Sequence, residues 1–148
     1  MTPDLGRFLE VASAHLLQRT ASALEGGYEQ SSVMTLAILL GVAREEVDRA
    51  AARRFEENAA LREFFRKWQG VVEDEALRSR IVAASQGSDP SLRVPDLEEN
   101  NARLRALLIE LHAQIEEQAG DEARACEDAL WRELALSTER RRLSLGPF

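Results

Sequence analysis

The sequence is poor in the residues that build disulfides, metal clusters and rigid loops. Its 148 residues include one cysteine, Cys126, two histidines, His15 and His112, and only four prolines. One cysteine excludes an internal disulfide and a Cys-x-x-Cys metal or redox pair, so we expect a cytoplasmic protein. With 45% hydrophobic and 30% charged residues, the composition also excludes a disordered or fibrous class.

Long apolar runs and an excess of basic residues are missing as well. The longest apolar run, residues 33–43, reaches about half of the roughly 20 residues that a membrane span needs. The amino terminus lacks the basic start and apolar core of a signal peptide. The 26 acidic and 19 basic residues give a net charge of −7, and the basic residues cluster only at Arg140–Arg142. We therefore expect no membrane association, and nucleic acid is disfavoured as a partner.

Helical periodicity dominates what is present. From Ser31 to Trp68, apolar residues recur three and four positions apart with no proline between them, which predicts one long amphipathic helix. Only Arg54 and Glu57 interrupt the apolar stripe, so the middle of this helix should face water or a polar partner. At 1.5 Å per residue the helix would be roughly 57 Å long, and it needs other helices or a second copy of the chain beside it.

Shorter helices are predicted on both sides of this long one. Thr2 and Pro3 can cap and start a first helix, which should end near Leu24 because Gly26–Gly27 follows. Another helix is expected from about Val72 to Ser85, and the Gly-, Ser-, Asp- and Pro-containing stretch after it, residues 86–94, should be a surface loop. Together these patterns predict an all-α antiparallel bundle of four to five helices with one long central helix, folded as a single domain over residues 1–148.

The last third of the chain, residues 95–143, has the spacing of a coiled-coil seam. Residues alternating four and three apart are Leu97, Asn101, Leu104, Leu108, Leu111, Ile115 and Gln118. Beyond Gly120 the apolar frame shifts to Ala123, Cys126, Leu130 and Leu134. The shift favours a helical hairpin that breaks at Gly120, with Asp121 as the cap of its second helix, over one continuous helix. Residues 144–148 should form a tail.

Gly41 allows two interpretations of the long helix. Leu36–Val47 resembles the helix-turn-helix pattern of bacterial repressors, with Ala37 and Gly41 at the small and turn positions and Val47 at a core position. This resemblance implies a DNA-binding regulator, to which Arg140–Arg142 would add positive charge. The apolar stripe, however, stays in frame from Val33 to Ala50, which predicts that the helix continues through Gly41 without a turn.

No catalytic constellation is found. A di-iron or di-manganese bundle needs Glu-x-x-His on two helices, but Ala12 and Ile109 stand three residues before His15 and His112. No glycine-rich loop suits a phosphate, and Cys126 falls on the apolar stripe, where an unpaired cysteine acts as a small hydrophobe. We therefore expect no catalytic residue, no catalytic metal and no cofactor.

One alternative is a small-molecule or metal-binding bundle. His112 has Glu116 one helical turn further on, a spacing that can place two ligands together, and Tyr28 is a further polar aromatic residue. We favour the simpler interpretation, in which His112 and Glu116 make an ordinary contact on the helix surface.

The apolar residues of the long helix suggest a partner. Val33–Ala43 is apolar on nearly all sides, so Val33, Leu36 and Leu40 can face the chain's own helices while other residues face away. The aromatic group at 64–68 either packs in the core or forms a partner surface. We therefore predict a homodimer and a non-catalytic structural or protein-interaction module, with these interface candidates: Met34, Ile38, Leu39, Phe64, Phe65 and Trp68.

Overall fold

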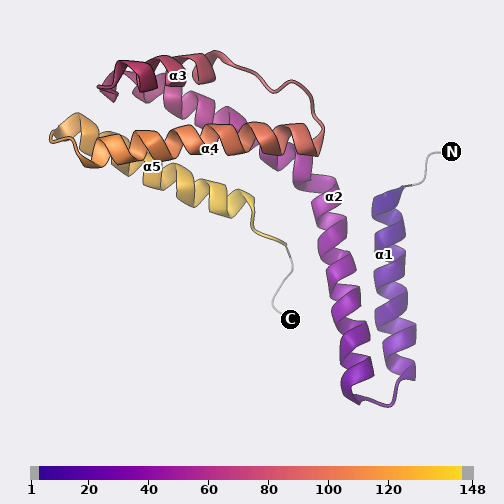
Figure 1. Cartoon of the computed structure of the whole chain (residues 1–148). Coiled ribbons are helices and arrows are strands. Elements are labelled where there is room, and N and C mark those ends of the chain that lie inside the picture. Colours follow the sequence, from indigo (N-terminus) through magenta and orange to yellow (C-terminus); the bar gives the residue numbers. More distant parts are fainter. Residues whose placement is uncertain (1–3, 145–148) are drawn as a thin grey trace. The chain divides into compact units, whose positions relative to one another are not determined.

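The computed structural model describes residues 4–144, and every regular element within them is a helix (Figure 1). The α-helices are α1 (Leu5–His15), α2 (Gly27–Trp68), α3 (Glu75–Gln86), α4 (Val94–Glu116) and α5 (Asp121–Arg140). A π-helical turn, Leu16–Thr20, and a 3-10 turn, Ala21–Ala23, extend α1, and another 3-10 turn, Gln69–Val71, follows α2. The structure confirms the all-α class and the long central helix. No helix in the described part of the chain is long and apolar enough to cross a membrane.

The long helix α2 has 42 residues and passes through Gly41 without a turn, as the unbroken apolar stripe predicts. It begins at Gly27, four residues earlier than expected. Gly26 and Gly27 have φ angles of 89° and 82°, a left-handed conformation that glycine adopts without steric cost. Because Gly41 lies inside α2, the turn required by the helix-turn-helix resemblance is not present.

The contacts of the chain gather in two compact units. Residues up to Ala50, together with Leu143 and Ser144, form one unit, and residues Ala51–Arg142 form the other. We call residues 4–50 the N-terminal hairpin and residues 51–142 the C-terminal bundle. The boundary between the two units lies within α2, which contributes its first part to the hairpin and its second part to the bundle. The single domain expected over residues 1–148 stays a prediction.

The C-terminal bundle contains the large core of the described chain. The second part of α2 packs with α3, α4 and α5 around buried side chains that include Phe65, Ile81, Leu111 and Leu130. Six of the seven predicted seam residues are buried in α4, namely Leu97, Asn101, Leu104, Leu108, Leu111 and Ile115, whereas Gln118 lies beyond the end of α4 and is half-buried. In α5, Ala123, Cys126 and Leu130 are buried and Leu134 is half-buried. The helical hairpin is therefore confirmed.

Several helix ends differ from expectation by a few residues. The break after α4 lies at Gly120, with φ 138°, and Gly120 is itself the N-cap of α5, so Asp121 begins the helix and does not cap it. α3 starts at Glu75 because Asp74 is its N-cap and accepts a 2.6 Å hydrogen bond from the Leu77 backbone amide. The residues between α3 and α4 are 87–93, and α5 ends at Arg140.

The N-terminal hairpin has no comparable core. α1 lies beside the first part of α2, and the Ser13 hydroxyl donates a 2.8 Å hydrogen bond to the Ala37 carbonyl (Figure 1). Asp4 caps α1 by accepting a 3.0 Å hydrogen bond from the Arg7 amide, and the expected cap at Thr2 and Pro3 lies outside the described residues. The buried apolar residues of this hairpin are alanines, namely Ala21, Ala37 and Ala50.

Candidate functional site

Large apolar side chains remain exposed over the N-terminal hairpin. Phe8 is 67% exposed and Leu36 is 55% exposed. The other exposed large side chains of the hairpin are Leu5, Val11, Leu17, Tyr28, Met34, Leu39 and Val47. Two helices in contact bury only the residues between them, so such a hairpin needs a further surface to cover its remaining apolar side chains.

Many of these residues share one face of the hairpin. Each residue turns a helix by about 100°, so Leu36 and Val47 lie about 80–100° to one side of Ala37, which contacts α1. Leu5 and Phe8 lie about 80–140° from Ser13 in the same rotational sense. In an antiparallel helix pair, equal senses of rotation lead to the same face. Leu39 lies about 160° from Ala37 in that sense, at the edge of the same face. We call this the apolar face and define it as Leu5, Phe8, Leu36, Leu39 and Val47.

The apolar face carries no charge along α2. The positions on this side of α2 between residues 32 and 50 are Ser32, Val33, Leu36, Leu39, Leu40, Ala43, Val47 and Ala50. Further along the same side of α2, the first charged residue is Arg54, which belongs to the C-terminal bundle. The uncharged stripe is therefore confined to the N-terminal hairpin.

The interface candidates of the long helix occupy different sides of it. Met34 and Leu39 are exposed, as expected, whereas Ile38 is half-buried. The orientation expected for Leu36 is wrong: it was assigned to the chain's own helices, but Ala37 faces α1, and a one-residue step rotates Leu36 away. Only Leu39 among the candidates lies on the apolar face.

Phe64, Phe65 and Trp68 belong to the C-terminal bundle. Phe65 is 0% exposed, Phe64 is also buried, and Trp68 is half-buried against the same core. The rings of Phe64 and Phe65 meet edge to face, with their centroids 6.3 Å apart. The sequence allows this aromatic group either to pack in the core or to form a partner surface, and Phe64 and Phe65 pack in the core.

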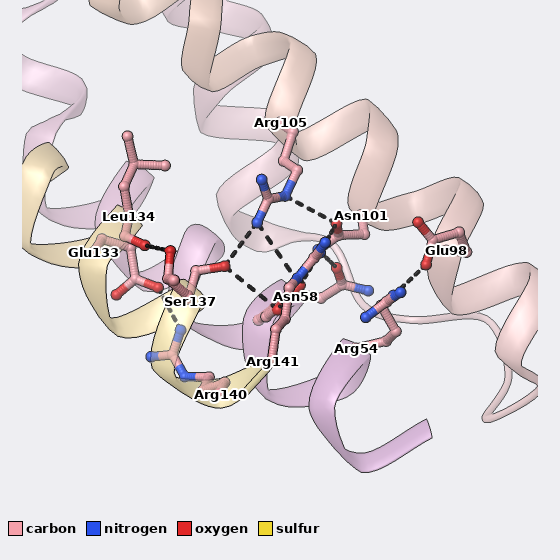
Figure 2. A network of polar contacts seen from close by, with 12 residues as sticks. Arg54, Asn58, Glu98, Asn101, Arg105, Glu133, Leu134, Ser137, Arg140 and Arg141 are labelled. Carbon is pink, nitrogen blue, oxygen red and sulfur yellow. Dashed lines mark hydrogen bonds and ion pairs between the residues drawn. The ribbon is translucent and has the colours of Figure 1, made fainter. Parts of the chain in front are cut away.

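A polar network lies inside the bundle at Glu57, which is 1% exposed although it carries a charge. The Arg141 guanidinium donates hydrogen bonds of 2.7 and 2.6 Å to its two carboxylate oxygens. Arg105 lies 3.9 Å away, and Asn101 donates a 3.3 Å hydrogen bond from α4. Figure 2 shows Asn101 and Arg105, both from α4, converging with Arg141 from the end of α5. The polar partner expected for this part of α2 is thus supplied by the chain itself.

A second buried carboxylate holds the connection between α3 and α4. Asp89 accepts hydrogen bonds of 3.0 Å from both terminal nitrogens of Arg62, and Asn58 donates another at 2.8 Å. Asn100 also donates to Asp89, so α2 and α4 both hold the loop. The sequence indicates a surface loop at this position, but it does not indicate that Asp89 turns inward.

The surrounding residues set the charge of both carboxylates. Burial raises the pKa of Glu57, but the hydrogen bonds and positive charge of Arg141 outweigh it and leave that pKa below its ordinary value. Burial likewise raises the pKa of Asp89, and hydrogen bonds from Arg62, Asn100 and Asn58 lower it further than burial raises it. Both groups therefore remain ionised inside the bundle at neutral pH.

We expect the C-terminal bundle to lose stability as pH falls below about 4, near the ordinary pKa of carboxyl groups. The lowered pKa values of Glu57 and Asp89 mean that the unfolded chain binds protons at higher pH than the folded chain. Their stabilisation is present above the unfolded pKa and is lost as pH falls through the folded pKa. Urea unfolding at a series of pH values measures this loss. A doubly substituted Glu57→Gln, Asp89→Asn chain should show a flatter acid limb, and an unchanged limb would contradict the assignment.

Within residues 4–144, the remaining chemically reactive side chains show no catalytic arrangement. Cys126 is buried, and this burial, with a smaller effect of Glu122, raises the pKa of its thiol to about 12. A thiol with this pKa stays protonated at neutral pH and is a poor nucleophile. Tyr28 and His15 are exposed in the N-terminal hairpin. His112 Nε2 lies 3.5 Å from a Glu116 carboxylate oxygen, in agreement with the expected spacing.

The basic cluster at the end of α5 is matched by the chain's own carboxylates. Arg140 lies 2.6 Å from Glu133, Arg142 lies 3.4 Å from Glu139, and Arg141 pairs with Glu57. Such pairing reduces the positive charge that the cluster presents to a phosphate backbone.

The sequence indicates only some of the residues that form the buried polar network. Asn101 stands out as a polar residue in a heptad seam, and Glu57 as a break in an apolar stripe. Their partner Arg141 carries no such signal, because an arginine in a basic cluster has the pattern of a surface residue. No family model, curated protein or solved structure matches this chain.

Proposed function

We propose that this chain is a non-catalytic protein-interaction module of the cytoplasm that forms a homodimer through the apolar face of its N-terminal hairpin. One observation carries the proposal: large apolar side chains are exposed on a helical hairpin whose only buried apolar residues are alanines. The C-terminal bundle, by contrast, has its own core of large side chains. The bundle therefore has no need of a partner to cover its core, and we assign the dimer contact to the N-terminal hairpin.

A second copy of the chain suits the apolar face for geometric and electrostatic reasons. Two hairpins give four helices, which is a common closed arrangement around a shared core. A two-fold axis places the same face of both copies in contact. The chain carries a net charge of −7, but the α2 side of the apolar face has no charged residue between positions 32 and 50. Along α2, pairing through this face therefore avoids like-charge contacts.

The expected affinity is moderate. Complete burial of a large apolar side chain stabilises by roughly 1.5–3 kcal/mol, and the side chains of the apolar face are already about half-buried. About 1 kcal/mol for each of the five, counted over both copies, gives roughly 10 kcal/mol. The rigid-body cost of association is about 4–15 kcal/mol, so at best about 6 kcal/mol remains, which corresponds to a dissociation constant of roughly tens of micromolar.

The dimer is tested by sedimentation velocity over a range of micromolar concentrations. We expect wild-type chain to sediment as a dimer, and Leu36→Glu to sediment as a monomer, because dimerisation would bury an unpaired carboxylate from each copy. Met34→Glu is the matched control, since Met34 is similarly exposed on α2 but lies outside the apolar face. Circular dichroism should show the same helix content in all three proteins.

Two results would overturn this proposal. A wild-type chain that remains monomeric at the highest concentration would show that a second copy does not cover the apolar face. A dimer that resists Leu36→Glu but dissociates with Met34→Glu would place the contact on the other side of α2.

A further inference from the structure

A histidine and two glutamates from neighbouring helices converge on the surface of the C-terminal bundle. His112 and Glu116 lie one turn apart on α4, and Glu127 approaches from α5. His112 Nε2 is 3.5 Å from a Glu116 oxygen and 4.0 Å from a Glu127 oxygen. The three ligand atoms all lie within 4.8 Å of one another. This group includes Glu127, which the sequence does not connect with His112.

The histidine nitrogen at the centre of this group has an unusual environment. His112 Nε2 is inaccessible to solvent, yet it makes no hydrogen bond with any described residue. Two carboxylates face this nitrogen. The Glu116 side chain is 58% exposed and the Glu127 side chain is 38% exposed, so Glu127 is the more enclosed of the two. Two carboxylates at this separation repel each other unless a positive charge lies between them.

The distances approach those of a metal site. Zinc binds histidine nitrogen and carboxylate oxygen at about 2.0–2.2 Å, so tetrahedral ligands lie roughly 3.3–3.6 Å apart. The contact between His112 and Glu116 already has this separation, and Glu127 needs to approach His112 by about half an ångström. The oxygens of the two glutamates lie within 4.8 Å of each other, so they need to close by at most about 1.5 Å. A glutamate side chain can make this adjustment by rotating its terminal torsions, without movement of the backbone.

We propose that His112, Glu116 and Glu127 bind one divalent transition-metal ion of the Zn²⁺ class. Imidazole together with carboxylate oxygen suits Zn²⁺ and its first-row neighbours better than Mg²⁺, which demands an octahedral set of oxygen ligands. The ion joins the C-terminal end of α4 to α5 and neutralises the two carboxylates. Its residues and its unit differ from those of the proposed dimer contact, so the two proposals stand independently.

Trp131 provides a spectroscopic reporter at the site. The rings of His112 and Trp131 meet at 89°, with centroids 5.5 Å apart, and both belong to the C-terminal bundle. A paramagnetic ion such as Cu²⁺, bound at His112 Nε2, lies close enough to quench the fluorescence of this indole. Trp68 is the other tryptophan of the chain, so a Trp131→Phe variant separates the two contributions.

The experiment is calorimetric titration of the full-length chain with Zn²⁺, with Mg²⁺ as a comparison ion. We expect one Zn²⁺ per chain and no saturable binding of Mg²⁺. Loss of an outer partner of a metal site typically weakens affinity about 10–100-fold, so His112→Gln and Glu127→Gln should each weaken Zn²⁺ binding at least about tenfold. Asp128→Asn is the matched control, because Asp128 is the exposed neighbour of Glu127 on α5.

Two further measurements separate ligand loss from misfolding. Zn²⁺ should raise the thermal unfolding temperature of the wild-type chain and of Asp128→Asn equally, and that of Glu127→Gln by less at the same Zn²⁺ concentration. Cu²⁺ should quench wild-type fluorescence strongly and Trp131→Phe only weakly. The proposal is overturned if the wild-type chain shows no saturable Zn²⁺ binding, or if His112→Gln and Glu127→Gln retain the wild-type affinity.

Discussion

Replacement of Glu57 with alanine is expected to lower the free energy of unfolding of the C-terminal bundle by about 3–5 kcal/mol. Glu57 is 1% exposed and accepts two short hydrogen bonds from Arg141. Its removal leaves Arg141 without this carboxylate and Asn101 without one of its acceptors, so the desolvation of these groups is no longer compensated. Urea unfolding followed by circular dichroism measures the change.

Glu63→Ala is the control for this substitution. Glu63 lies on the same helix but is exposed and pairs with the exposed Arg66, so its loss should cost less than about 1 kcal/mol. If Glu57→Ala and Glu63→Ala destabilise the chain equally, the buried network does not hold α4 and the end of α5 against α2. Glu57→Gln should fall between the two, because glutamine keeps the shape of the side chain but loses its charge.

Phe65→Ala is expected to destabilise the same bundle by about 3–5 kcal/mol, because it removes a fully buried ring and leaves a cavity. Thermal or urea unfolding of the variant tests this expectation. Phe55→Ala removes the same ring from a position of α2 that is 48% exposed, so its effect should be much smaller. An interface role for Phe65 would give the opposite pattern, with reduced self-association and unchanged stability of the monomer.

The sequence predicts the helices well because their evidence is local. Spacing of apolar residues identifies α4 and α5, and Gly120 marks the break between them because its positive φ suits glycine. The continuity of α2 through Gly41 follows from an apolar stripe that stays in frame. Each of these conclusions depends on neighbours within a few turns of the same helix.

Contacts between distant segments are much less predictable. Leu36 is misplaced by the sequence because periodicity defines a stripe but not the direction in which a neighbouring helix lies, and α1 contacts Ala37. Glu57 and Arg141 are separated by 84 residues, so no local pattern can pair them. The inward position of Asp89 also depends on Asn58 and Arg62, which come from another helix.

For the site residues too, the part that lies within one helix is predictable from the sequence, and the part that depends on packing between helices is not. The spacing of His112 and Glu116 is visible within one helix, whereas Glu127 joins them only through the packing of α5 on α4. The apolar face likewise combines α1 with α2, and its extent follows from the way these helices are rotated against each other. Sequence periodicity therefore indicates that surplus apolar residues exist, and the three-dimensional structure determines which of them form a common surface.

Because Cys126 is buried in the C-terminal bundle, chemical labelling of its thiol can report transient opening of that bundle. The thiol is the only one in the sequence, and it is protonated and enclosed while the bundle is closed. A thiol-specific reagent can reach its sulfur only during transient exposure of the α5 core. When closing is faster than modification, the observed labelling rate scales with the population of open molecules, in the same way as amide hydrogen exchange. The labelling rate of this one sulfur atom thus reports transient opening of the C-terminal bundle, and the exposed hairpin does not contribute to it.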